Sequence, residues 1–127
     1  MFNGNIINES ATLAFNVQSN LTGGAFTAVK FSDTGIATAT AGDIPVGIMT
    51  AEHELPIVAG DEVTIQIKGI TLWIVGENVT AGDLLAVGTD GVAMKATAGK
   101  FILAQALMNG TTGEAIQVQI IKAGYAV

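Results

Sequence analysis

The chain contains no cysteine and no arginine, and it has only one histidine and two prolines among its 127 residues. Without cysteine it can form neither disulfides nor thiolate metal sites. Proteins that bind nucleic acid gather Lys and Arg side chains against the phosphates. Here five lysines are scattered singly along a chain whose net charge is −6. We therefore expect no nucleic-acid partner.

Long apolar runs are also missing, although 50% of the residues are hydrophobic and the mean hydropathy is +0.54. A helix that spans a membrane needs about 18 or more consecutive apolar residues. The apolar stretches here, such as Leu72–Val75 and Leu84–Val87, are far shorter. The start of the chain does not have the pattern of a signal peptide either. We expect no membrane segment, and we expect the apolar excess to lie either between subunits or in a core rich in Ala and Val.

Residues that could support catalysis or bind a metal are few and badly spaced. His53 lies between Glu52 and Glu54, but in a strand neighbouring side chains point to opposite faces, so this triplet does not converge. No second histidine is available to complete a typical zinc site. No serine lies in a Gly-x-Ser-x-Gly elbow, the motif of many serine hydrolases. The sequence therefore predicts no catalytic residue, no metal and no cofactor, and hence a protein that is not an enzyme.

The tripeptide Ala-Gly-Asp occurs three times, ending at Asp43, Asp61 and Asp83. Calcium binding would need several oxygen ligands at the spacing of an EF-hand or of an RTX repeat, and neither spacing is present. A turn explains the tripeptide without a metal, because Gly allows a positive φ and Asp can bond back to the local backbone. We interpret all three as structural turns.

The strongest positive signal is an internal repeat. Residues 24–49 are similar to residues 82–108, and residues 59–67 are similar to residues 112–120. The shared residues are mainly Gly, Ala, Val, Ile and Thr, which build backbone and surface rather than an active site. Repeats of this length indicate a supersecondary unit that is used twice.

Most of the repeated segments have the pattern of short strands. Glu62–Lys68 alternates strictly between apolar and polar residues, and Ala115–Lys122 begins in the same way, as half-buried strands do. Asp90-Gly91 between apolar runs predicts a hairpin. No stretch keeps a helical period, but single helical turns are expected at 80–85 and after Asp43. The sequence predicts an all-β fold, a barrel or a sandwich. Further candidate strands are 26–31, 36–39, 46–51, 70–75, 92–96 and 101–108.

Residues 1–21 lie outside the repeat and form a predicted N-terminal arm, followed by a single β domain over 22–127 with halves at about 22–69 and 80–124. The arm is rich in Asn, and such a segment can add a strand to another protein's sheet or pair with its own domain; both alternatives stay open. Its candidate contact residues are the spaced apolar ones: Phe2, Ile6, Ile7, Leu13, Phe15 and Val17.

Two aromatic residues are candidates for a subunit interface. Trp73 is the only tryptophan, and this residue type is enriched at binding hot spots. The alternative for Trp73 is a place in the core. Tyr125 could contact a neighbouring subunit, or it could lie in an exposed tail.

In order and spacing, the repeated segments resemble the capsid cement, or decoration, proteins of tailed bacteriophages. Within them, Ile44–Gly69 is similar to the lambda-type head decoration proteins, with Val-Gly-Ile followed by a Thr-Ile-Gln-Ile-Lys-Gly strand. The segments that carry the resemblance are 24–30, 44–48, 59–69, 79–85 and 114–118.

This resemblance implies a compact β domain of barrel or β-tulip type that binds the outside of the head and stabilises the capsid. It implies a trimer, a major capsid protein as partner, an N-terminal arm that extends a capsid sheet, and assembly onto the virion after synthesis in the host cytoplasm. Two other functions stay open from the residues alone. One is a carbohydrate-binding or adhesive β module of a surface or head-fibre component, and the other is a small β-barrel enzyme.

Overall fold

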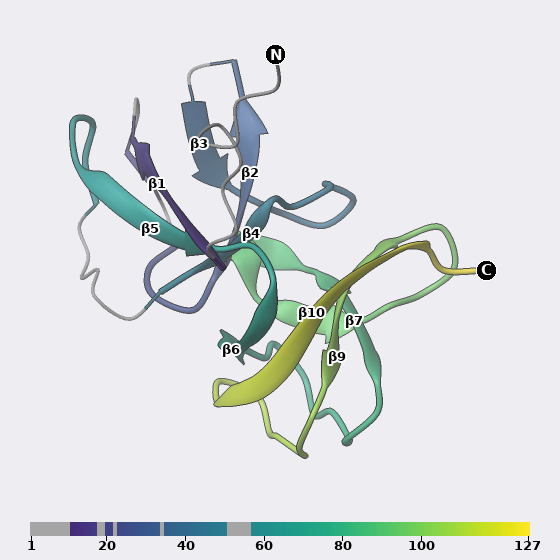
Figure 1. Cartoon of the computed structure of the whole chain (residues 1–127). Helices are drawn as coiled ribbons and strands as arrows, with labels where there is room; N and C mark the ends of the chain where they lie inside the picture. Colours follow the sequence, from purple (N-terminus) through teal and green to yellow (C-terminus); the bar gives the residue numbers. More distant parts are fainter. Residues whose placement is uncertain (1–10, 18–19, 22, 34, 51–56) are drawn as a thin grey trace, which may run out of the picture.

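The computed structural model describes residues 11–17, 20–21, 23–33, 35–50 and 57–127 (Figure 1). These residues form ten β-strands and one short 3-10 turn, and no helix among them is long and apolar enough to cross a membrane. The elements are β1 Thr12–Asn16, β2 Ala28–Ser32, β3 Gly35–Thr38, β4 Gly47–Met49, β5 Glu62–Gln66, β6 Gly69–Ile74, β7 Leu84–Val87, η2 Thr89–Gly91, β8 Ala93–Lys95, β9 Phe101–Ala106 and β10 Ala115–Tyr125.

The strands form two antiparallel sheets with the same topology. The first sheet has the order β1-β5-β4-β2-β3, and the second has the order β6-β10-β9-β7-β8. Each strand of one sheet therefore has a counterpart five strands later. The register agrees as well: Ala28 lies opposite Ile48 in the first sheet, and Leu84 lies opposite Gln105 at the same place in the second. The internal repeat of the sequence is thus a repeat of whole sheets.

The all-β prediction is confirmed, and the predicted strands are found with shifts of a few residues at their ends. The two predicted helical turns are wrong. Residues 80–83 form a turn that leads into β7, and residues 40–43 form a turn of the same kind. The hairpin predicted at Asp90-Gly91 is present, since β7 and β8 pair on either side of η2.

Both sheets curl until their edge strands approach each other. In the second sheet, Val75 after β6 forms a parallel bridge with Ala93 of β8. The Gly76 N–H also donates to the Ala93 carbonyl oxygen at 2.8 Å. In the first sheet β1 and β3 are in contact, and the rings of Phe15 and Phe31 meet edge to face at 5.6 Å. Each half is therefore a small, strongly curved β unit.

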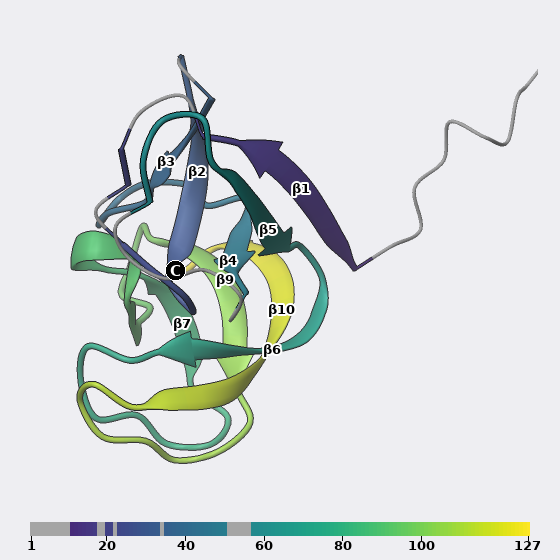
Figure 2. The same ribbon diagram turned by 90° about the vertical axis from the view of Figure 1, so that its left-hand side faces the viewer.

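Two hydrophobic cores lie one behind the other. The first sheet encloses one of them, which includes Val29, Met49 and Ile65. The second sheet encloses the other, and this core also contains Ala28 and Ile48 from the first sheet. Because side chains alternate along a strand, β2 and β4 send one residue into each core. In Figure 2, β2 and β5 lie above β6 and the lower part of β10, with β4 between them.

Candidate interaction surfaces

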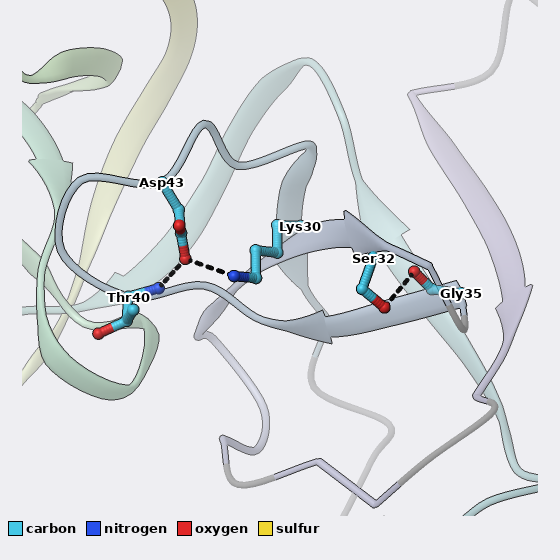
Figure 3. Close-up of polar contacts among 5 residues, drawn as sticks. All are labelled: Lys30, Ser32, Gly35, Thr40 and Asp43. Carbon is cyan, nitrogen blue, oxygen red and sulfur yellow. Dashed lines mark hydrogen bonds and ion pairs between the residues drawn. The ribbon is translucent and has the colours of Figure 1, made fainter.

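The Ala-Gly-Asp tripeptides form hydrogen-bonded turns, as predicted. In Thr40–Asp43 the Asp43 N–H donates to the Thr40 carbonyl oxygen at 3.0 Å, and the Asp43 carboxylate accepts the Thr40 N–H at 2.9 Å (Figure 3). Residues 58–61 and 80–83 repeat both bonds. The glycine of each turn has a φ between +92° and +98°, which a type II turn requires at its third residue.

A fourth turn of the same kind uses glutamate. The Glu114 carboxylate accepts the Thr111 N–H at 2.6 Å and the Thr111 hydroxyl at 2.8 Å. These two hydrogen bonds lower the pKa of Glu114. Burial works to raise the pKa of Asp43, but the Thr40 N–H and the Lys30 ammonium at 2.9 Å outweigh it, so that pKa is lowered too. The carboxylates in these turns therefore act as backbone caps.

Asparagine side chains fasten three of these turns to neighbouring segments. The amide oxygen of Asn20 accepts the Ala59 N–H at 3.1 Å, and that of Asn109 accepts the Ala81 N–H at 2.8 Å. Asn78 makes a longer bond of the same kind to Thr112, at 3.3 Å. Asn20 and Asn78 occupy matching places in the two halves, since each precedes an isolated bridge to the segment before a turn. The loops are therefore tied to the sheets by polar contacts.

Trp73 belongs to the core of the second half, close to the layer shared with the first. Its side chain is fully buried, and the indole Nε1 donates to the Gly91 carbonyl oxygen at 2.8 Å. Gly91 lies directly against β2, because a Cβ at that position would come within 2.8 Å of the Ala28 carbonyl oxygen. The core alternative therefore holds for Trp73, which has no exposed surface to offer another subunit.

The candidate arm residues fall into two groups. Phe2, Ile6 and Ile7 lie outside the described residues. Leu13, Phe15 and Val17 lie in or directly after β1, which pairs with β5 along its whole length. Val17 is 2% exposed, and Phe15 packs against the core of the first half. Within residues 12–16 the arm thus pairs with its own domain.

Several large apolar side chains lie on the surface. Tyr125, the second interface candidate, is 60% exposed and meets Phe101 edge to face at 5.7 Å. Phe31 is 63% exposed, Ile70 is 60% exposed, and Ile44 is 54% exposed. Single exposed apolar side chains are ordinary on protein surfaces. An exposed apolar side chain indicates a binding surface only where it lies beside a groove or beside backbone groups that lack a partner.

Two of the grooves on the described surface lie along the second sheet. The larger, of 560 Å³, is lined by residues of β7, β8 and the loops around them, including Glu77, Met94, Lys95 and Lys100. The smaller, of 490 Å³, runs along β6 and is lined by uncharged residues only. They are Phe26, Thr50, Gln66, Ile70, Thr71, Leu72 and Gln117.

The candidates for catalysis and metal binding are only partly covered by the described residues. No three His, Asp or Glu side chains of this part of the chain are grouped so that they could hold a metal ion. Ser32 lies in the β2–β3 hairpin, where its hydroxyl donates to the Gly35 carbonyl oxygen at 3.1 Å (Figure 3). His53 lies outside the described residues.

Comparison with known proteins shows a similarity in fold but none in sequence families. No protein-family model and no curated protein sequence matches the chain. The fold, however, is similar to the crystal structure of the N base of the head fiber gp8.5 in bacteriophage phi29. The TM-score is 0.64 at 18% sequence identity, and the match covers 91% of this chain and 98% of the other. The similarity therefore concerns the whole fold of both chains and not a shared fragment.

Sequence reasoning missed the groove along β6. The only signal for it is the segment Gly69–Ile74, which is apolar apart from Thr71 and carries no charge. Such a segment is as typical of a buried central strand as of an edge strand. Its position at the edge of the second sheet follows from the topology alone.

Proposed function

We propose that this chain is a structural protein of a phage head, which binds the outer surface of the capsid and stabilises it. The observation that carries the proposal is the fold similarity to the phi29 head-fiber base, which extends over nearly the full length of both chains. The sequence resemblance to capsid cement proteins points in the same direction and rests on different evidence. The proposed partner is the major capsid protein, and the proposed assembly is a homotrimer.

The architecture suits such a role. A cement protein works by linkage, because a ligand that binds only the assembled shell shifts the equilibrium towards that shell. This requires a stable body and contact surface, and no active site. Two curved sheets with a shared layer supply the body, and exposed apolar residues such as Phe31, Ile70 and Tyr125 supply contact surface.

A second candidate function is favoured by the same structural neighbour, which is the base of a head fiber. In that function this chain would anchor a fibre or an adhesive domain to the head without strengthening the shell. The two functions share the binding step and differ in its effect. Heat resistance of the head separates them.

The test is co-sedimentation of the purified protein with expanded heads of its own phage that lack it. The full-length chain is compared with a variant that lacks residues 1–10, because a longer deletion would remove β1 from the first sheet. Saturable binding by the full-length chain alone supports the proposal and places the grip in the arm. Equal binding by both supports the function and places the contact on the β body.

Two further outcomes decide the rest. Decorated heads that melt at a higher temperature than bare heads support the cement role, whereas binding without a change in melting supports the fibre base. If neither chain sediments with the heads at micromolar concentration, the proposal is wrong.

A further inference from the structure

We propose that the free edge of β6 receives an extended segment of a head-surface subunit as an additional strand. This inference rests on the proposed function and names the contact that the β body makes. It starts from the hydrogen-bonding directions of the β6 backbone. Val75 N–H donates to the Glu114 carbonyl oxygen of the β10 side at 2.9 Å, whereas Ile74 N–H points the other way, to the Phe26 carbonyl oxygen at 3.0 Å.

Because these directions alternate along a strand, the main-chain groups of Leu72 and Ile70 also face away from β10. No backbone partner for their N–H groups lies among the described residues. The Leu72 carbonyl oxygen has only a long contact, at 3.5 Å, from the Thr71 hydroxyl. Among the described residues, Ile70 and Leu72, two positions apart, thus have N–H groups without a backbone partner along the 490 Å³ groove, and an extended main chain matches that spacing.

The described parts of the other sheet edges face neighbouring strands and are less open to an additional strand. The edge of β8 is met by Val75 and Gly76, and β1 and β3 lie against each other. Edge strands of free-standing proteins usually carry charges, a proline or a bulge that discourage pairing. The edge at β6 has none of these over 69–74, and Ile70 stands 60% exposed on it.

Charge indicates the kind of partner. The groove is lined by uncharged side chains, and the nearest charge along the strand is the exposed Lys68, directly before β6. An uncharged or weakly acidic strand with apolar residues opposite Ile70 and Leu72 fits this surface, since residues directly opposite share a face. A second copy of this chain at the same edge would appear as a dimer, which the test below distinguishes from binding to the head.

The test uses variants of the full chain and expanded heads that lack it. Leu72→Pro removes the outward N–H of the edge without touching a bond to β10, and edge positions of this kind tolerate proline. Ile70→Lys places a charge on the same edge. Leu84→Lys is the matched control, because Leu84 is an exposed apolar residue of the same sheet at 42% exposure but lies on β7. Circular dichroism and thermal melting verify that each variant is folded.

We expect Leu72→Pro and Ile70→Lys each to weaken head binding by about tenfold or more, and Leu84→Lys to bind like the wild type. Hydrogen exchange supplies a second readout. The Leu72 amide should exchange fast in the free protein and slowly on heads, whereas the Trp73 amide, which faces β10, should be slow in both.

Three results would overturn the inference. Wild-type binding by both edge variants, together with fast exchange at Leu72 on heads, would refute it and leave the proposed function intact. A concentration-dependent dimer that Leu72→Pro abolishes would assign the edge to a second copy of the chain. Failure of the wild type itself to bind heads would refute both the inference and the function on which it rests.

Discussion

Replacing Trp73 by phenylalanine tests how much the buried indole and its hydrogen bond contribute to the stability of the fold. The change keeps an aromatic ring in the core but removes the N–H that reaches the Gly91 carbonyl oxygen at 2.8 Å. A buried acceptor left without its partner costs about 1–3 kcal/mol. The smaller ring leaves a void at a fully buried site, which adds about 1 kcal/mol. We therefore expect a loss of about 2–4 kcal/mol in the free energy of unfolding.

Thermal unfolding followed by circular dichroism or calorimetry measures this loss. For a domain of this size a change of 1 kcal/mol shifts the melting temperature by roughly 3–6 °C, so Trp73→Phe should melt on the order of 10 °C below the wild type. Fluorescence is unsuitable, because the variant contains no tryptophan.

Tyr125→Phe is the control for Trp73→Phe. It also trims one polar atom from an aromatic ring, but at a side chain that is 60% exposed, and surface changes of this kind usually stay within about 0.5 kcal/mol. If both variants melt within about 2 °C of the wild type, the bond from Trp73 to Gly91 does not stabilise the fold as argued and the reasoning above is wrong.

Three further predictions follow from the turns and the cores. The pKa values of Asp43 and Glu114 are lowered from 3.8 and 4.5, so the stability that these two carboxylates contribute is complete above those values and is lost as the pH falls through the folded pKa values. Melting temperatures of the wild type should therefore fall between about pH 5 and about pH 2.5. They should fall less steeply in D43N and E114Q. Gly82→Ala should lower the free energy of unfolding by about 1–2 kcal/mol from its φ of +94° alone, since a Cβ there meets nothing within 4 Å. Gly47→Ala should lower it far more, because its Cβ would overlap the Gln66 carbonyl oxygen. A denaturant titration of both variants measures the difference. The two cores share a layer of strands, so calorimetric and van't Hoff enthalpies should agree in a single transition, and two separate transitions would contradict the shared layer.

The sequence predicts the strands well where one face is buried and the other is polar. Val63 and Ile65 alternate with Thr64 and Gln66, and the period of two shows directly in β5. The same rule of alternation fails at Leu84–Val87, which is apolar throughout because three of its four residues are buried. A short continuous apolar run does not distinguish a strand from a helical turn, and the helical turn predicted over 80–85 extends into this run.

Pairing partners are harder to predict than strands. The alternation of Leu13, Phe15 and Val17 predicts a strand, but it holds equally for a strand that pairs with β5 and for one that pairs with another protein. Only the register, with Leu13 opposite Ile65, decides this for residues 12–16. The groove along β6 is hidden for the same reason, since the edge of a sheet is a property of the topology and not of any one segment.

The two halves are related head to tail and not face to face, so the outer face of the second sheet has no third unit packed against it among the described residues. The side chains of Ala28 and Ile48, on the outer face of the first sheet, enter the core of the second half. The matching pair on the back of the second sheet is Leu84 and Gln105. A head-to-tail contact has no symmetry that closes it, so a contact of this kind can repeat. Gln105, which is half-buried and bonded to the Gly82 carbonyl oxygen, stands where Ile48 would be. A polar residue thus stands where the first half presents an apolar one, and polar outer faces on terminal repeats are what keep longer arrays from growing.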